Sequence, residues 1–325
     1  MKAAVIYQPG GPQQLLLQER AVPKPGEGQV LVKIKAFGLN RSELMTRKGF
    51  SPGVIFPRIL GIECVGEVAD DPSGQWSSGQ KVAAFMGGMG RDFDGSYAES
   101  AVLPKTILEP FSSSLPWDIL GALPEMFQTT YGSLYKALQI KSGEVILVRG
   151  GTSSIGLLAI QLAKVAGLTV LATTRNPEKE QFLKDKGADF VVIDNTRIRE
   201  SVRYIFPDGI NKVLDLVGTS TLADSLQCAA PGGIVCMTGM LSETWSFKDF
   251  APMDYIPSTV SLTTYNTGEI RIGAAEFQSF IYDIEGGNIQ ISIGSTFALE
   301  EIVTAHQLMD SNRASGKIVI VNDQN

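Results

Sequence analysis

Cysteine and histidine are scarce in this sequence. Its 325 residues include the cysteines Cys64, Cys228 and Cys236 and a single histidine, His306. The cysteines lie far apart and form no CxxC pair, which argues against a disulfide framework and against a cysteine-rich metal site. We expect the thiols to be small buried apolar groups and His306 to be a surface or packing residue.

Long apolar runs and excess positive charge are also missing. No stretch approaches the roughly 18–20 apolar residues of a membrane helix, and the segment before Pro9 is too short for a signal peptide. We therefore expect a cytoplasmic protein without a membrane partner. The net charge of −6 disfavours contact with a phosphate backbone, so a nucleic-acid partner is not expected. A local basic site for a small phosphorylated ligand stays compatible with this charge.

The length predicts two domains, and the residue patterns change along the chain. Glycine and proline turns separate short alternating segments in the first third, which predicts β-strands at 30–36, 64–69, 81–85 and 98–102. In the middle, buried-type strands at 145–148, 169–173, 190–193, 212–217 and 233–237 alternate with helices at 154–166 and 177–186. This alternation predicts βαβ units and a parallel sheet. Helices at 274–285 and 299–310 and a strand at 317–321 follow.

A Gly/Ser-rich turn between the first strand and helix of the middle region is the strongest local motif. It consists of Gly151, Thr152, Ser153, Ser154, Ile155 and Gly156. A strand before and a helix after it are the context of a dinucleotide fingerprint, in which backbone amides and the helix dipole bind a pyrophosphate. Ser153 replaces the middle glycine of GxGxxG. The alternative is an ordinary strand-to-helix turn with serine caps.

The end of the next strand indicates which dinucleotide binds. NAD enzymes carry an acidic residue there for the ribose 2′-hydroxyl, whereas this chain has Thr174 and Arg175, with Lys179 one helical turn later. A hydroxyl and a guanidinium suit a 2′-phosphate. We therefore predict NADPH (NADP) as the cofactor. The alternative for Arg175 is a solvated surface side chain.

Further motifs in a fixed order carry a family resemblance. They are Met1-Lys2-Ala3, residues 38–43 and 56–63, Gly95-Ser96-Tyr97-Ala98-Glu99, Thr129-Thr130-Tyr131, the Ser-rich fingerprint, residues 215–218 and 316–319. Together they resemble the medium-chain dehydrogenase/reductase superfamily and its zinc-free quinone oxidoreductase-like branch. The resemblance implies an α/β fold, a doubly wound parallel Rossmann sheet plus a GroES-like antiparallel β domain. The GroES-like domain would span 1–122, with 266–325 returning to it, and the Rossmann NADP-binding domain 123–265. The ligand is expected in the cleft between them.

The resemblance also implies that no metal is bound. The zinc-dependent members place cysteine where Asn40 stands and histidine where Ile62 stands, and an amide and an alkyl group do not replace thiolate and imidazole on zinc. Without a metal, the expected reaction is direct hydride transfer to a small-molecule quinone or similar electrophilic carbonyl acceptor.

The remaining site residues follow from the resemblance and from their positions at strand ends. Asn40 and Thr129 are expected near the nicotinamide, although Asn40 can equally be a turn amide and Thr129 a helix residue bonded to its own backbone. Val217, Gly239 and Met240 follow the carboxyl ends of parallel strands, where ligands of α/β proteins bind. The alternative for these is plain loop geometry.

The proton donor is not evident from the sequence. Besides Asn40, Tyr131 is the catalytic candidate, with Tyr265 and Glu43 behind it; either tyrosine can instead be a packed aromatic side chain. Trp245 and Phe247 are expected either to wall the substrate pocket or to anchor their loop.

Two other functions stay open. Zinc-free relatives also reduce activated C=C bonds of enals, enones or acyl-CoA thioesters, and some are lens structural or RNA-binding proteins. A homodimer is implied, formed through the strand near 258–265, whose β-rich edge would otherwise stay unpaired.

Overall fold

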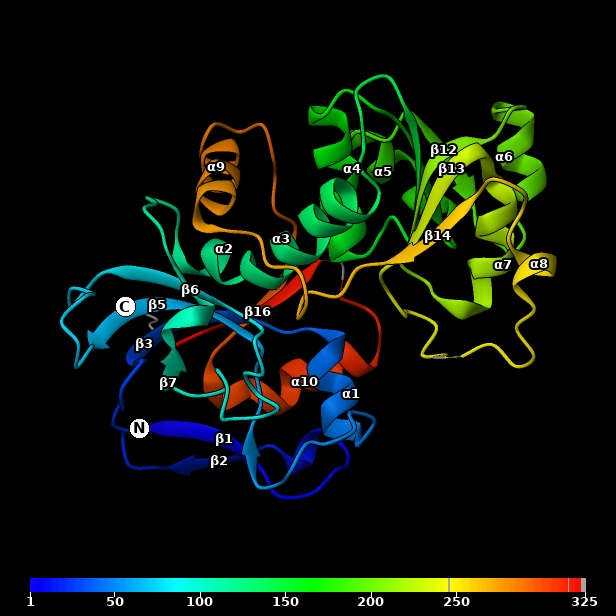
Figure 1. Ribbon diagram of the computed structural model, residues 1–325. Coiled ribbons are helices and arrows are strands. Elements are labelled where there is room, and N and C mark those ends of the chain that lie inside the picture. Colours follow the sequence, from blue (N-terminus) through cyan, green and yellow to red (C-terminus); the bar gives the residue numbers. More distant parts are fainter. Residues whose placement is uncertain (245, 315, 323–325) are drawn as a thin grey trace. The chain divides into compact units, whose positions relative to one another are not determined.

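The computed structural model describes residues 1–244, 246–314 and 316–322. The chain divides into two compact units (Figure 1). The first consists of Met1–Glu125 and Ile272–Asn325, and the second of Met126–Arg271. Trp245 lies outside the described residues. Within the described residues, no helix has the length and apolar character needed to cross a membrane.

The first unit is built on largely antiparallel sheets. Its strands are β1 (Lys2–Ile6), β2 (Leu16–Glu19), β3 (Gln29–Gly38), β4 (Arg58–Ile59), β5 (Glu63–Asp70), β6 (Lys81–Phe85), β7 (Ser100–Pro104), β8 (Leu108–Pro110), β15 (Ile293–Phe297) and β16 (Lys317–Val321). A three-stranded sheet has the order β2-β1-β4, and a seven-stranded sheet has the order β15-β16-β3-β5-β6-β8 with β7 beside β3. The last strand of the chain thus pairs with β3, Val319 opposite Gly38.

The helices of this unit are α1 (Arg41–Lys48), α2 (Trp117–Gly121), α9 (Ala274–Glu285) and α10 (Ile302–Asp310). Helix α1 begins at a capping residue, because the backbone N–H of Asn40 donates to the carboxylate of Glu43 (3.1 Å). It ends at Gly49, whose φ of 88° lies in the left-handed region that glycine adopts most readily. A contiguous apolar core formed by strand residues such as Val32, Ile34 and Leu103 joins the sheets to α10.

The second unit contains one parallel sheet. Its strands are β9 (Val145–Arg149), β10 (Thr169–Thr174), β11 (Phe190–Ile193), β12 (Ile210–Asp215), β13 (Ala229–Met237) and β14 (Ser261–Thr264). They stand in the order β11-β10-β9-β12-β13-β14, and each neighbouring pair is parallel. In sequence order within the unit this is 3-2-1-4-5-6, the Rossmann arrangement. The strand order reverses between β9 and β12, and such a switch point is where α/β sheets bind ligands.

Helices cover both faces of this sheet. The unit contains α3 (Pro124–Tyr131, beginning just before it), the π-helix Gly132–Ala137, α4 (Ser154–Val165), α5 (Glu180–Asp185), α6 (Arg199–Ile205), α7 (Thr219–Cys228) and α8 (Pro252–Tyr255). Figure 1 shows α4 and α5 on one side of the sheet and α6 and α7 on the other. The predicted α/β, doubly wound fold is therefore confirmed.

Candidate functional site

The turn between β9 and α4 has the geometry of a phosphate-binding loop. The Ser153 hydroxyl accepts a hydrogen bond from the Gly156 amide (3.1 Å) and donates one to the Gly150 carbonyl (2.8 Å), which closes the turn. In the described part of the chain, the backbone amides of Thr152, Ser154 and Ile155 have no acceptor. These N–H groups stand at the positive end of a 12-residue helix, an arrangement that favours an anion.

The last residue of the fingerprint, Gly156, has no space around it for a side chain. A Cβ at this position would stand 2.4 Å from the carbonyl oxygen of Gly150 and 2.8 Å from the Cα of Gly151. Any larger side chain would therefore push the helix away from the loop. Gly151 is less restricted, because a Cβ there would stand 3.0 Å from the carbonyl oxygen of Thr173. The two glycines thus allow the loop, the helix and the end of β10 to pack closely, as in a dinucleotide-binding turn.

The end of β10 presents a guanidinium and no acid. Thr174 is buried, and its hydroxyl bonds to the backbone of Asn176, accepting from its N–H (3.1 Å) and donating to its C=O (3.2 Å). Arg175 is exposed, and among the described residues it has no hydrogen-bond or ion-pair partner. The Lys179 ammonium lies over the Phe182 ring, 5.3 Å from its centroid. Arg175 is accordingly the group here that is available to bind a 2′-phosphate.

The predicted residues at the ends of β12 and β13 lie on tightly bonded turns. Asp215 accepts the amides of Val217 (2.8 Å) and Gly218 (2.9 Å). A Cβ at Gly239 would lie 2.4 Å from the Leu216 carbonyl oxygen, so these two loops pack backbone against backbone. Met240, like Val217, is partly exposed at this edge of the sheet. The ligand contacts of these residues stay a prediction.

Asn40, in the first unit, is the centre of a buried polar cluster. Its Nδ2 donates to Glu63 Oε1 (2.8 Å) and to Glu43 Oε1 (3.4 Å), and its Oδ1 accepts from the Lys317 ammonium. Lys317 also pairs with Glu63 at 2.8 Å, and both side chains are almost fully buried. Both amide hydrogens of Asn40 are therefore engaged by protein carboxylates. Asn40 is partly exposed, and the second lone pair of its Oδ1 is the group left to accept a hydrogen bond from a ligand.

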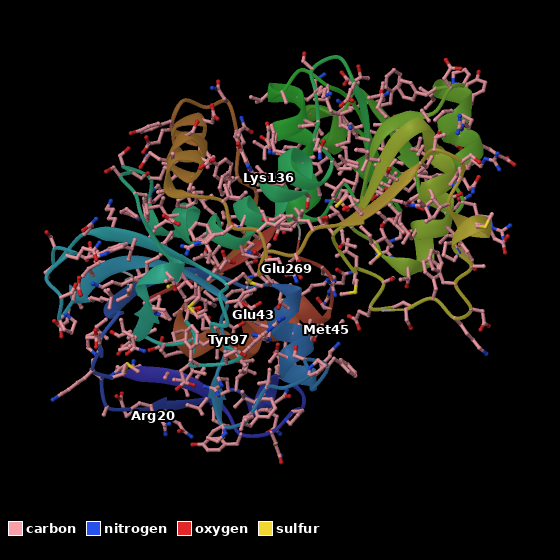
Figure 2. The ribbon with its side chains drawn as sticks, viewed as in Figure 1. Arg20, Glu43, Met45, Tyr97, Lys136 and Glu269 are labelled. Carbon is pink, nitrogen blue, oxygen red and sulfur yellow. The ribbon has the colours of Figure 1, made fainter. Side chains whose placement is uncertain are left out.

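Glu43 is the most strongly perturbed carboxyl of this cluster. Besides Asn40, it accepts the backbone amide of Ile62 (3.3 Å). Burial and the neighbouring Glu63 carboxylate raise the pKa of Glu43 to about 7. Figure 2 shows Glu43 beside Tyr97 in the same unit. Near neutral pH, Glu43 is therefore protonated in part of the molecules, as expected for a group that exchanges protons.

The tyrosine candidates have different surroundings. The Tyr265 hydroxyl donates to the Ile270 carbonyl (2.6 Å) and accepts from Gln128 Nε2 (3.1 Å), and its ring lies against Gly132, where a Cβ would clash. Tyr265 is therefore a packed, fully bonded side chain. Tyr131 is partly exposed and packs against Tyr135, with ring centroids 4.3 Å apart. Its catalytic role stays a prediction.

Thr129 and Phe247 complete the predicted set. Thr129 is buried on α3, and its carbonyl accepts from the Ser133 hydroxyl (2.7 Å) where the helix passes into the π-helix. Phe247 stacks on Phe250, with centroids 5.3 Å apart, and packs against Tyr255. Phe247 thus anchors its loop. Its predicted companion Trp245 lies outside the described residues.

The donors near Asn40 do not fit zinc. They are an amide, two glutamates and a lysine ammonium, and the ammonium is already the cation paired with Glu63, whereas zinc sites combine carboxylates with thiolate or imidazole ligands. Within the described ranges, no group of three or more His, Cys, Asp or Glu residues is placed to hold a metal ion. His306 is a packing residue, fully buried, with Nδ1 accepting from Arg47 Nε (3.2 Å) and Nε2 lying 2.9 Å from the Tyr97 hydroxyl. The cysteines are buried as predicted.

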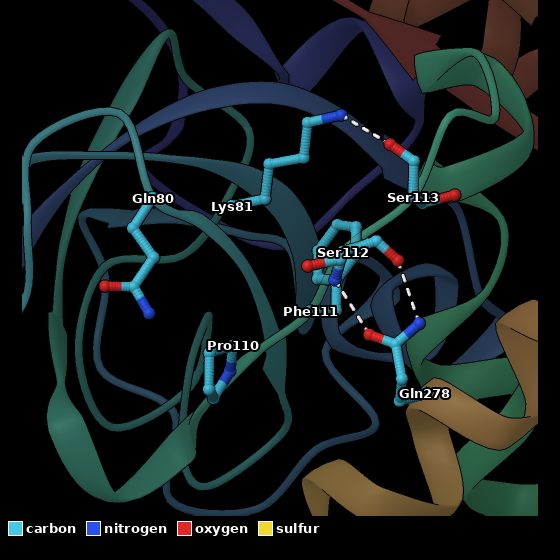
Figure 3. Close-up of a pocket in the computed structure, with 7 residues that line it drawn as sticks. All are labelled: Gln80, Lys81, Pro110, Phe111, Ser112, Ser113 and Gln278. Carbon is cyan, nitrogen blue, oxygen red and sulfur yellow. Dashed lines mark hydrogen bonds between the residues drawn. The ribbon is translucent and has the colours of Figure 1, made fainter.

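A separate surface pocket in the first unit contains none of the predicted site residues. It has a volume of about 500 Å³ and is lined by Gln80, Lys81, Pro110, Phe111, Ser112, Ser113 and Gln278 (Figure 3). Its polar groups bond to one another: Lys81 Nζ donates to the Ser113 carbonyl, and Gln278 Nε2 to the Ser112 carbonyl, each at 2.8 Å. Because these polar groups already bond to the protein, few of them are left to bind a ligand. We therefore do not assign this pocket to the reaction.

Sequence reasoning missed the charged partners of the site. Glu63 and Lys317 belong to the motifs 56–63 and 316–319 that carry the family resemblance, but nothing in those motifs points to a contact with Asn40. The Asn40-x-x-Glu43 spacing is a capping signal and does predict the start of α1. Arg149 was also missed, although an arginine at the end of an otherwise apolar strand is a signal that it needs buried acidic partners.

Comparison with known proteins agrees with both units. Residues 26–113 match the alcohol dehydrogenase GroES-like domain family, and residues 186–320 match the zinc-binding dehydrogenase family. The human quinone oxidoreductase is 26% identical, over 99% of this chain and 98% of its own. The acryloyl-coenzyme A reductase of Sulfurisphaera tokodaii is 26% identical, over 98% of this chain and 99% of its own. A mycobacterial protein solved as a complex with NADPH superposes with a TM-score of 0.88 at 25% identity, covering 99% of this chain and 100% of that one.

The pairing of a GroES-like antiparallel unit with a Rossmann sheet defines a class of two-domain oxidoreductases, and the first unit has the predicted GroES-like fold. The chain belongs to the medium-chain dehydrogenase/reductase superfamily, in its quinone oxidoreductase-like branch.

Proposed function

We propose that this protein is an NADPH-dependent, zinc-independent reductase that transfers a hydride to a quinone or a similar electrophilic carbonyl acceptor. The observation that carries the proposal is the anion-binding end of α4, followed at the end of β10 by Arg175 in place of an acid. The NADPH complex of the mycobacterial relative and the quinone oxidoreductases among the relatives support it.

The residues present fit NADPH. The amides of Thr152, Ser154 and Ile155 would bind the pyrophosphate, and Arg175 the 2′-phosphate, with Lys179 adding positive charge nearby. When bound, NADPH supplies the hydride. In the first unit, Asn40 Oδ1 would accept a hydrogen bond from a donor group of the bound cofactor, and Glu43 holds a proton at its carboxyl, one hydrogen bond away from the Asn40 amide.

Reduction of an activated C=C bond is the second candidate. It is favoured by the acryloyl-coenzyme A reductases among the relatives, which match along nearly the whole chain. The same arrangement for hydride transfer serves an enone or enal, because the β-carbon of such an acceptor is electrophilic. A quinone is electrophilic in the same way.

Two acceptors, a 1,4-quinone and an α,β-enone, are offered in parallel to test these candidates. The oxidation of NADPH and of NADH is monitored by absorbance with each acceptor. NADPH-dependent turnover of the quinone alone supports the main proposal, and turnover of the enone alone supports the second. NADPH binding without turnover of either acceptor would contradict both.

The Arg175→Ala variant tests the cofactor assignment. We expect its affinity for NADPH to fall by about 1.5–3 kcal/mol, the value of a charged hydrogen bond, while NADH binding stays nearly unchanged. Calorimetric titration of both nucleotides measures this difference. Equal losses for both would show that Arg175 does not bind the 2′-phosphate.

We also propose that the protein is a homodimer that pairs through β14. Within the described residues, β14 pairs only with β13 and is one edge of the six-stranded sheet. Leu262→Pro removes a backbone donor from this strand, so we expect monomers or aggregates by light scattering. Leu262→Val is the control that keeps the strand. A Leu262→Pro protein with unchanged dimer mass would contradict the assignment of this edge.

A further inference from the structure

Arg149 is a fully buried arginine at the switch point of the Rossmann sheet. It is the last residue of β9 and directly precedes Gly150 of the phosphate loop. Burial of a guanidinium is unfavourable unless its donors are satisfied. Five donors in one plane allow arginine, unlike lysine or histidine, to bond several groups in different directions at once. The direction of each contact therefore shows which parts of the unit Arg149 holds together.

The first set of contacts leads to the loop that follows β11. Arg149 binds Asp194 through two bonds, from Nε to Oδ2 (2.8 Å) and from Nη2 to Oδ1 (3.0 Å). Asp194 Oδ1 also accepts the amide of Thr196 (2.8 Å). Thr196 has a φ of 79°, a left-handed conformation that β-branched residues rarely adopt. The Arg149–Asp194 pair thus holds this loop in a conformation that its sequence does not favour.

The same pair is bonded to the phosphate loop itself. The Thr173 hydroxyl donates to Asp194 Oδ2 (3.4 Å) and accepts the amide of Gly150 (3.1 Å). Asp194 also donates its backbone amide to the carbonyl of Thr174 (2.8 Å). The phosphate loop, the end of β10 and the loop after β11 are therefore connected through one carboxylate.

The second set of contacts leads to helix α7 and the loop that follows β12. Arg149 Nη1 lies within hydrogen-bond distance of Asp224 Oδ2 (2.9 Å), Ser225 Oγ (3.0 Å) and the Thr221 carbonyl (3.1 Å). The Ser225 hydroxyl donates to Asp215 Oδ2 (2.6 Å). The other oxygen of Asp215 accepts the amides of Val217 and Gly218. Ser225 thus connects the guanidinium to the turn after β12. Because β12 lies on the other side of β9 from β10, where the 2′-phosphate is expected, this turn would face the nicotinamide half of the cofactor.

We propose that Arg149 is a positioning residue for the cofactor, one that holds the adenosine-side loop through Asp194 and the nicotinamide-side loop through Ser225 and Asp215. This inference rests on the proposed NADPH-binding function. Arg149 is fully buried and its donors are engaged by the protein, so it acts on the cofactor through these loops and not by contact. The loops after β11 and β12 and the phosphate loop all stand at the carboxyl edge of the sheet, where the Rossmann fold binds dinucleotides.

The two sets of contacts can be separated by single substitutions. Asp194→Asn removes the charge of the first set, and Ser225→Ala removes the hydroxyl that connects the second. Thr173→Val is a milder change in the first set, which keeps the inference testable if Asp194→Asn does not fold. Lys212→Met is the matched control. It breaks another mostly buried ion pair of the same unit, Lys212–Glu144 (3.6 Å), which forms near the start of β12 and just before β9, away from the carboxyl edge.

The probes are 2′,5′-ADP, which contains only the adenosine half, and intact NADPH, each titrated by calorimetry beside a thermal unfolding curve. We expect Asp194→Asn and Thr173→Val to weaken both probes by about tenfold, the effect of a lost hydrogen bond at the upper end of its range. We expect Ser225→Ala to weaken NADPH binding severalfold and to change the affinity for 2′,5′-ADP by no more than about twofold. Lys212→Met should lower the unfolding temperature and change neither affinity.

A purely structural role for Arg149 predicts a different result. In that case the variants lower the unfolding temperature as Lys212→Met does, yet bind both probes like the unaltered protein, and the inference is overturned. Equal weakening of 2′,5′-ADP by Ser225→Ala and Asp194→Asn would also overturn the assignment of separate sides. Failure of the unaltered protein to bind either probe overturns the proposed function, and this inference with it, so the two failures are distinguishable.

Discussion

A Lys317→Met variant is expected to unfold with a free energy about 3–5 kcal/mol smaller than that of the unaltered protein, the effect of leaving a buried charge without its partner. Lys317 pairs with Glu63 at 2.8 Å, and the two side chains are 2% and 0% exposed. Without the ammonium, Glu63 keeps only the bonds from the Asn40 amide and from the backbone N–H of Glu125 (2.7 Å). The Asn40 carbonyl would lose its protein donor as well. Urea unfolding curves measure the change.

An exposed ion pair supplies the control for this prediction. Lys184 and Glu180 pair at 2.7 Å on the surface of α5, one helical turn apart. Lys184→Met should lower the unfolding free energy by only about 0.3–0.5 kcal/mol. The double variant Lys317→Met/Glu63→Gln should regain part of the lost stability, because no buried charge is left unpaired. A loss for Lys317→Met as small as that for Lys184→Met would show that water reaches Glu63.

The sequence predicted those parts of the fold that local patterns determine. Helix α9 and the strands β6, β11 and β16 begin and end where the residue patterns of the sequence placed them. A single helix was predicted at each of 177–186 and 299–310. Each segment instead begins with a 3₁₀ turn, at Pro177–Lys179 and at Leu299–Glu301, before the α-helix starts. The π-helix at Gly132–Ala137 was not predicted. The Tyr265 ring lies against Gly132 at the start of this helix. Because the two residues are 133 positions apart, their contact leaves no local pattern in the sequence.

The candidate site divides in the same way. The phosphate loop is contiguous in sequence, so its glycines and serines could be read directly, and the structure gives each a place in one turn. The cluster around Asn40 joins residues 40, 43, 63 and 317, and only the first two are close enough in sequence to form a motif. Its charges were therefore found only once β3, β5 and β16 were placed side by side.

Two buried groups should contribute opposite slopes to the pH dependence of stability. Burial and Glu63 raise the pKa of Glu43 from 4.5 to about 7, so the folded state binds a proton that the unfolded state has released. Its contribution is complete below pH 4.5 and is lost as the pH rises towards 7. Burial and the Arg47 charge lower the pKa of His306 from 6.5 to about 3. Its contribution is complete above pH 6.5 and is lost as the pH falls towards 3.

Because these windows overlap between pH 4.5 and 6.5, the two slopes partly cancel in the unaltered protein. In Glu43→Gln, which keeps the shape of the side chain without its titration, the His306 slope remains and stability should rise with pH across this window. The gain relative to the unaltered protein should reach about 3 kcal/mol above pH 7, since each shifted pKa unit corresponds to about 1.4 kcal/mol. His306→Gln should show the reverse slope. Urea unfolding in steps from pH 4.5 to 8 compares the three proteins. Parallel curves for all three would mean that neither group keeps its perturbed pKa in the folded state, and that Glu43 does not hold the proton that the proposed reaction assigns to it.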